Sequence, residues 1–152
     1  MKHCWPMKKK WMRNFKKVMS QQINAELLAL KKTLIEGMVN FMKYGGAEDE
    51  NDESYDPDFD AGYTQTNVDE CDKILTDFLN NLVTAPANGR NDFITTSVKS
   101  VVLKLNNLNS ECDGGLIETD QREQICALIF SAVEQAGLAT KGVDITEEWR
   151  EW

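Results

Sequence analysis

Apolar residues recur at steps of three and four along the first quarter of the chain. The positions that follow this spacing are Phe15, Met19, Ile23, Leu27, Leu30, Leu34, Met38 and Phe41. Such spacing places side chains on one face of an α-helix, and the pair Gly45 and Gly46 is a typical stop signal. The pattern therefore predicts one long amphipathic helix at the start of the chain.

A second helical stripe runs through Cys71, Ile74, Leu75, Phe78, Leu79 and Leu82. Asn67 and Glu70 stand before it at the spacing of a capping box, and the turn-forming stretch 85–89 follows it. Segment 92–108 is ambiguous, because its Ile, Thr and Val content is typical of a strand while its apolar residues keep helical steps. Its length favours a helix, and the strand stays the alternative.

The last third of the chain predicts two more helices. Thr119 is expected to be an N-cap, with Asp120 and Glu123 placed where the helix dipole favours negative charge, and Gly137 is typical of a helix end. A short final helix is expected to begin near residue 144 or 146 and to place tryptophans on one side. Together the segments predict an all-α fold, a single helical domain over 1–152 of about five helices.

The longest stretch without periodicity, residues 46–66, is the acidic loop, which we expect between the first and second helices. Eight of the thirteen residues from 48 to 60 are acidic and none is basic. Residues 1–43 carry about +8, so a net charge of −8 leaves about −16 for the remainder. Charge arranged in this way favours binding of a positively charged partner.

We take the acidic loop as the candidate binding site, because its carboxylates alternate with aromatic residues that could anchor a partner. The candidate partner-binding residues are Glu48, Asp49, Glu50, Asp52, Glu53, Tyr55, Asp56, Asp58, Phe59 and Asp60. One alternative is a solvated, partly disordered loop without a partner. A calcium loop is disfavoured, because its glycine stands one place late, at Gly62, and its twelfth position is Asn67 instead of a glutamate.

Composition excludes several other classes. A pI near 4.7 argues against a nucleic-acid-binding protein, and no apolar run is long enough to cross a membrane. Catalytic chemistry is sparse, because the only histidine is His3 and no nucleophile–base pair is suggested. We therefore expect no enzyme, no cofactor and no metal. The widely spaced Cys4, Cys71, Cys112 and Cys126 indicate reduced thiols in a cytoplasmic protein, with a Cys112–Cys126 disulfide as the alternative.

The basic residues of the first helix allow two interpretations. Residues 1–13 form a basic extension that could be disordered or could lie on an anionic membrane or nucleic acid. We favour a solubilising segment that pairs with the protein's own acidic surface, because the remaining −16 would oppose approach to a polyanion.

Two resemblances add to this interpretation. The stretch 118–126, continued by Phe130, Glu134, Gly137-Leu138 and Trp149, resembles the C-terminal part of a small uncharacterised bacterial helical family. In charge, size and helical build, the chain also resembles immunity proteins of toxin–immunity systems, including those of contact-dependent growth inhibition. That second resemblance implies a small acidic protein paired with a basic nuclease toxin, and it carries no site residues.

The first functional hypothesis is therefore an immunity protein that binds a cognate toxin domain, a basic nuclease, and occludes its active site. The alternative is a regulatory or adaptor helical bundle that binds its partner through the N-terminal amphipathic helix. A weak hydrolase or metal-dependent enzyme is the third hypothesis. The sequence leaves the oligomeric state open.

Overall fold

A computed structural model describes the backbone of residues 5–152 and the side chains from Ala25 onward. Its helices are α1 (Trp5–Tyr44), α2 (Gln65–Val83), α3 (Arg90–Glu111) and α4 (Thr119–Gln135). Within residues 5–152 no strand is formed, so the all-α prediction and the helical interpretation of 92–108 are confirmed. Helix α1 ends directly before Gly45 and Gly46, as predicted.

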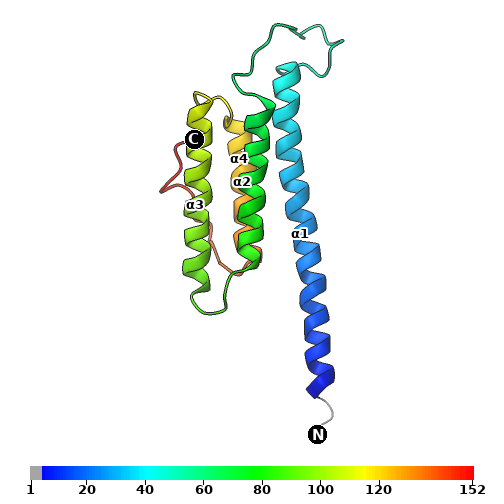
Figure 1. The fold of residues 1–152 in the computed structure, drawn as a ribbon, viewed down its shortest axis with the longest axis vertical. Coiled ribbons are helices and arrows are strands. Elements are labelled where there is room, and N and C mark those ends of the chain that lie inside the picture. The colour runs from blue at the N-terminus through cyan, green and yellow to red at the C-terminus, as the bar shows by residue number, and fades with distance from the viewer. Residues whose placement is uncertain (1–4) are drawn as a thin grey trace.

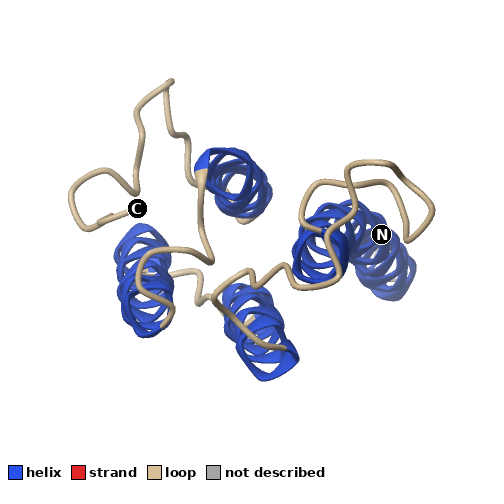
Figure 2. Ribbon diagram, turned by 90° about the horizontal axis from the view of Figure 1, so that it is seen from above, coloured by secondary structure: helices blue, strands red, loops and turns tan. Residues whose placement is uncertain are grey.

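Helices α2, α3 and α4 lie beside the C-terminal part of α1, and α2 and α3 reach past its middle, while the N-terminal part of α1 projects beyond them (Figure 1). Seen from above, the helices surround a common interior (Figure 2). Helix α1 packs on α4 and α2, and α2 packs on α3. Residues 5–13, assigned from the sequence to a basic extension, are the start of α1 in this structure.

One hydrophobic core holds the four helices in a single domain. Helix α1 contributes Leu27, Leu34 and Met38, which follow the stripe predicted from the sequence. The other helices contribute residues that also keep helical steps, including Leu75, Val98, Leu105, Ile125 and Ile129. Full burial of an aliphatic side chain of this size contributes roughly 1.5–3 kcal/mol to folding. Periodicity and burial therefore agree along every helix whose side chains are described.

Polar contacts fix how α1 sits against its neighbours. The Lys31 ammonium group pairs with Asp72 of α2 and donates a hydrogen bond to Thr76 Oγ1 at 3.0 Å. On the other flank, Gln135 Nε2 of α4 donates to Glu26 Oε2 at 3.1 Å. Because Glu26 lies next to the first buried residue of α1, this contact is near the edge of the packed bundle.

The two predicted N-caps are wrong by one to three residues. The N-cap of α2 is Thr64, whose backbone N–H donates to Asn67 Oδ1 at 2.9 Å. The N-cap of α4 is Glu118, whose N–H donates to Gln121 Oε1 at 3.2 Å. In both helices an amide side chain in the first turn reaches back to the cap, so Thr119 is the first helical residue instead of the cap.

The predicted final helix is not formed. Residues 144–152 make one turn and then run along the bundle, because Asn106 of α3 binds their backbone in place of a helical neighbour. Asn106 Nδ2 donates to the Trp149 carbonyl at 2.7 Å, and Asn106 Oδ1 accepts the Glu151 N–H at 3.1 Å. Trp149 and Trp152 pack on the core. The segment 137–152 is called the C-terminal strap below.

None of the helices in the described part combines the length and the apolar character that a membrane crossing requires. Helix α1 is long enough, but its many lysines interrupt the apolar stripe.

Candidate protein-interaction surface

The acidic loop is seated on the C-terminal end of α1 by two aromatic contacts. The Phe59 ring meets Phe41 edge-on, with 5.3 Å between ring centroids, and Tyr55 meets Tyr44 with 6.2 Å between centroids. Edge-to-face pairs of this kind add about 0.5–1.5 kcal/mol beyond the area that they bury. The two aromatic residues that the sequence suggested as partner anchors are therefore used to hold the loop on its own helix.

Gly45 makes the Phe59 contact possible. Its backbone has φ +69°, and a Cβ atom added to it would lie 2.8 Å from Cγ of Phe59. Only glycine offers both the left-handed conformation and the space for the ring. The glycine that ends α1 thus also forms the surface on which the loop rests.

Aspartates fold the acidic loop from within. Each of four aspartates accepts a hydrogen bond from the backbone N–H two residues later, at 2.7–2.9 Å: Asp49, Asp52, Asp56 and Asp60. This arrangement is the Asx-turn, in which a side chain takes the place of a backbone carbonyl. Half of the candidate carboxylates therefore have a structural role as well as a charge.

Asp52 is the most heavily used of these aspartates. It accepts the backbone N–H of Glu48 at 3.0 Å, and the backbone N–H and hydroxyl of Ser54 at 2.9 and 2.8 Å. These hydrogen bonds, with that from Glu48 first, hold the pKa of the Asp52 carboxyl below its ordinary value. Asp52 therefore stays ionised at neutral pH.

The other four carboxylates of the loop face solvent: Glu48, Glu50, Glu53 and Asp58. In the part of the chain whose side chains are described, they accept no hydrogen bond, and the four ion pairs found there lie outside the loop. The helix carries residues 8–17 to the far end of α1, roughly 40 Å from the loop at a rise of 1.5 Å per residue (Figure 1). Pairing of those lysines with the loop within one chain is therefore excluded by distance.

The calcium interpretation gains no support from the geometry. From residue 25 onward, no group of three or more His, Cys, Asp or Glu side chains is arranged to hold a metal ion. One carboxylate oxygen of Asp56 and one of Asp60 already accept backbone N–H groups of the loop.

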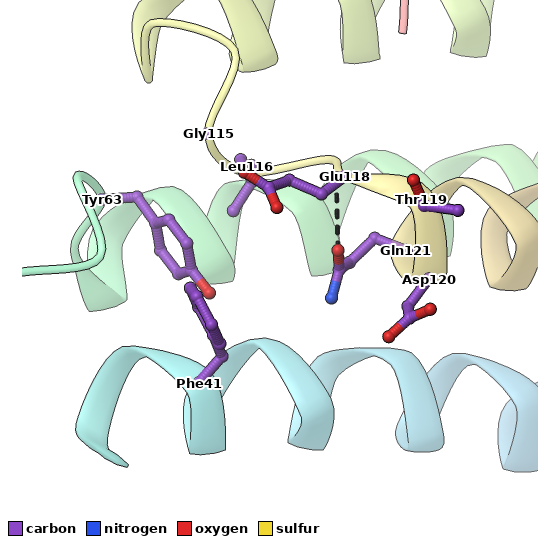
Figure 3. Close-up of a pocket in the computed structure, with 8 residues that line it drawn as sticks. All are labelled: Phe41, Tyr63, Gly115, Leu116, Glu118, Thr119, Asp120 and Gln121. Atoms are coloured by element: carbon purple, nitrogen blue, oxygen red, sulfur yellow. Dashed lines mark hydrogen bonds between the residues drawn. The ribbon is translucent and has the colours of Figure 1, made fainter. Parts of the chain in front are cut away.

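A shallow hollow of about 180 Å³ lies where the end of α1 meets the start of α4 (Figure 3). The Tyr63 hydroxyl at its wall donates to the Met38 carbonyl at 2.9 Å, and burial, with the nearby Cys112 and Glu118, raises the Tyr63 pKa to about 12. The phenol therefore stays neutral and serves the fold. The charged groups left at this hollow are the exposed carboxylates of Glu118 and Asp120.

The cysteines in the described region are free thiols, and Cys4 and His3 lie outside it. Burial raises the pKa of Cys71 to about 12, with the charge of Asp72 adding to the effect. Burial likewise raises the pKa of Cys112 and Cys126. Because a neutral thiol is a poor nucleophile, these residues serve packing, and the Cys112–Cys126 disulfide is not formed.

Comparison with known proteins gave no family model, no curated protein and no solved structure that matches the chain. Three exposed acids at the start of α4 lie on the side of that helix that faces α1: Glu118, Asp120 and Glu123. The glycine inside a helical pattern, Gly37, was the one sequence signal that could have pointed to this surface.

Proposed function

We propose that this protein is an immunity-type inhibitor, which binds a basic toxin domain of nuclease type and covers its active site. The supporting observation is that the acidic loop carries its charge on a surface already folded by its own Asx-turns and aromatic contacts. A pre-organised acidic surface loses little conformational entropy on binding and accelerates encounter with a cationic protein.

The solvent-facing carboxylates carry the interaction in this proposal, and the aspartates of the Asx-turns maintain the loop. Glu50, Glu53 and Asp58 are exposed and accept no hydrogen bond within the described structure, so converting them to amides removes charge without unfolding the loop. In contrast, an amide at Asp52 would weaken three hydrogen bonds as well. Charge and loop structure can therefore be tested separately.

The first prediction concerns the triple variant Glu50→Gln, Glu53→Gln, Asp58→Asn. We expect the association rate with the cognate basic toxin domain to fall by about tenfold or more at low salt, because steering depends on local potential. The salt dependence of that rate should decrease as well. Stopped-flow measurement over a salt series gives both values.

The matched control is Glu147→Gln, Glu148→Gln, Glu151→Gln, which removes the same charge from exposed positions of the C-terminal strap. This control should leave the rate nearly unchanged. Equal rates for the wild type and both triple variants would disprove the role of the loop.

A second candidate function is a regulatory or adaptor bundle whose partner binds along the N-terminal half of α1. The projection of that half beyond the bundle favours this candidate (Figure 1). Removal of residues 1–24 distinguishes the two functions. Toxin binding should survive the truncation under the first and partner binding should be lost under the second.

A further inference from the structure

Helix α1 consists of two halves of nearly equal length. Among the side chains of α1 that the structure describes, from Ala25 onward, the first buried one is Leu27, and Glu26 beside it contacts Gln135 of α4. Helices α2 and α4 pack on the C-terminal part of α1, whereas its N-terminal part extends beyond the ends of the other helices (Figure 1). Residue 26 lies close to the middle of the helix.

The covered half of α1 forms an open furrow with the first turns of α4. Two adjoining hollows, of about 390 and 180 Å³, share Asp120 and make up this furrow. Leu30 and Thr33 of α1 line the larger hollow, and Phe41 lines the smaller. With Gly37 between them, these positions keep helical steps along one side of α1, so the furrow follows the helix axis.

Gly37 stands one helical step from Thr33 and one from Phe41, on the same side of α1. Glycine inside a helix costs about 1 kcal/mol relative to alanine. A Cβ atom added at Gly37 would meet nothing within 4 Å, so no contact within the chain requires glycine there. Helix stability is lost at this position without any gain inside the described structure, which indicates that the space is used by something outside it.

The sequence of the projecting half complements this furrow. Steps of three and four continue upstream from Leu30 through Ile23, Met19, Phe15 and Met12. If a second α1 lies antiparallel to the first with residue 26 at the centre, position 15 falls opposite Gly37 and position 19 opposite Thr33. Two large residues of one half, Phe15 and Met19, then face the small residues Gly37 and Thr33 of the other.

Charge favours the same arrangement. The projecting half is basic, with Lys8, Lys9, Lys10, Arg13, Lys16 and Lys17. The rim of the furrow on α4 is acidic, with Glu118, Asp120 and Glu123 exposed. An antiparallel pair places each basic half beside an acidic rim, whereas a parallel pair would place the two basic halves together.

We propose that the furrow between α1 and α4 binds the projecting half of α1 from a second copy of this chain, in an antiparallel two-fold dimer centred near residue 26. The interface is isologous, so one pair of complementary surfaces is used twice. Because the bundle covers only one half of each α1, the two bundles lie at opposite ends of the helix pair. In this register the basic residues 8–10 of the second copy lie opposite residues 42–44, beside the helix end on which the acidic loop is seated.

Sedimentation equilibrium of the full chain tests the dimer. We expect a dimer at tens of micromolar protein in low salt, with weaker association at high salt because the ionic contacts are screened. Gly37→Leu fills the furrow and should raise the dissociation constant at least tenfold. The monomer fold should persist, because a Cβ atom at this position meets nothing within 4 Å and leucine is a better helix former. Lys32→Leu, on the opposite side of α1, is the control and should leave association nearly unchanged.

Charge reversal identifies the occupant of the furrow. The variant Lys9→Glu, Lys16→Glu and the variant Asp120→Lys, Glu123→Lys should each be mainly monomeric alone. Mixed in equal amounts they should form a heterodimer, because each arm then meets a furrow of opposite charge. Three results would overturn the proposal: a monomeric wild type at 100 micromolar in low salt, undiminished association of Gly37→Leu, or no association in the mixture. A folded monomer that binds a different protein through the furrow would assign the site to that protein instead.

Discussion

At the scale of single residues, Gly45 connects the end of α1 to the seating of the acidic loop. Its positive φ ends the helix, and its missing side chain admits the Phe59 ring. Gly62 also has a positive φ, of +80°, but a Cβ atom there would meet nothing within 4 Å. A comparison of substitutions at the two glycines therefore distinguishes the cost of backbone strain, present at both, from the cost of a clash with Phe59, present only at Gly45.

Replacement of Gly45 by alanine should destabilise the protein more than the same change at Gly62. Both variants place an L-residue in the left-handed region, at a cost of roughly 1–2 kcal/mol. Gly45→Ala adds overpacking against Phe59, which typically costs a further 1–3 kcal/mol or so. Urea denaturation measures both. In the double variant with Phe59→Ala, the excess cost of Gly45→Ala should disappear, and its persistence would contradict the proposed contact.

The acidic loop also shows what sequence can predict about single residues. Its charge and its exposure to solvent follow from composition, and the exposed Glu50, Glu53 and Asp58 agree with them. The environment of Tyr55 and Phe59 does not follow from composition, because it depends on which residues of α1 the loop meets after the chain reverses. Aromatic side chains between acids can equally anchor a partner or anchor the loop, and only tertiary contacts distinguish these uses.

At the scale of elements, the helices with a clear stripe were predictable and the C-terminal strap was not. Periodicity and stop signals are local properties, so the spacing that defines α1, α2 and α4 is visible in the chain itself. The strap also carries helical spacing, but Asn106 of α3 binds its backbone at two places. This competition comes from a residue about forty positions away in the chain, which no local pattern contains.

Asn106→Ala should release the strap. Loss of the side chain leaves the Trp149 carbonyl and the Glu151 N–H without their partner, which we expect to cost about 1–3 kcal/mol in unfolding free energy. Asn107→Ala is the control, because Asn107 is exposed on the same helix. Amide hydrogen exchange should show lost protection at Glu151 in the first variant only. Equal exchange in both variants would mean that the strap is held by its tryptophans alone.

At the scale of the whole molecule, opposite charges occupy the two ends of α1. The basic residues of 8–17 lie along the N-terminal part of α1, and the acidic loop follows the other end (Figure 1). The net charges of these segments were available from the sequence. The distance between the basic and the acidic segment could not be predicted from the sequence, because it depends on α1 continuing as one helix past the edge of the bundle. Because of this separation, the charges along one α1 complement those along a second copy that lies antiparallel to it.

Removal of residues 1–24 should leave a folded domain with a different response to salt. The core begins at Leu27, so the truncated chain keeps every buried residue found in the described structure, and we expect cooperative urea unfolding with an m-value close to that of the full chain. The truncation removes seven basic residues and no acidic ones, so the net charge changes from −8 to about −15.

Self-repulsion in the truncated domain should make its unfolding free energy rise with salt more steeply than that of the full chain, because screening relieves the excess negative charge. The control removes residues 1–34 and with them Leu27 and Leu34, and it should not fold. A truncated domain whose stability is insensitive to salt would show that its carboxylates are too well separated to repel one another. That result would also weaken the case for electrostatic steering by the acidic loop, because both effects depend on the same local potential.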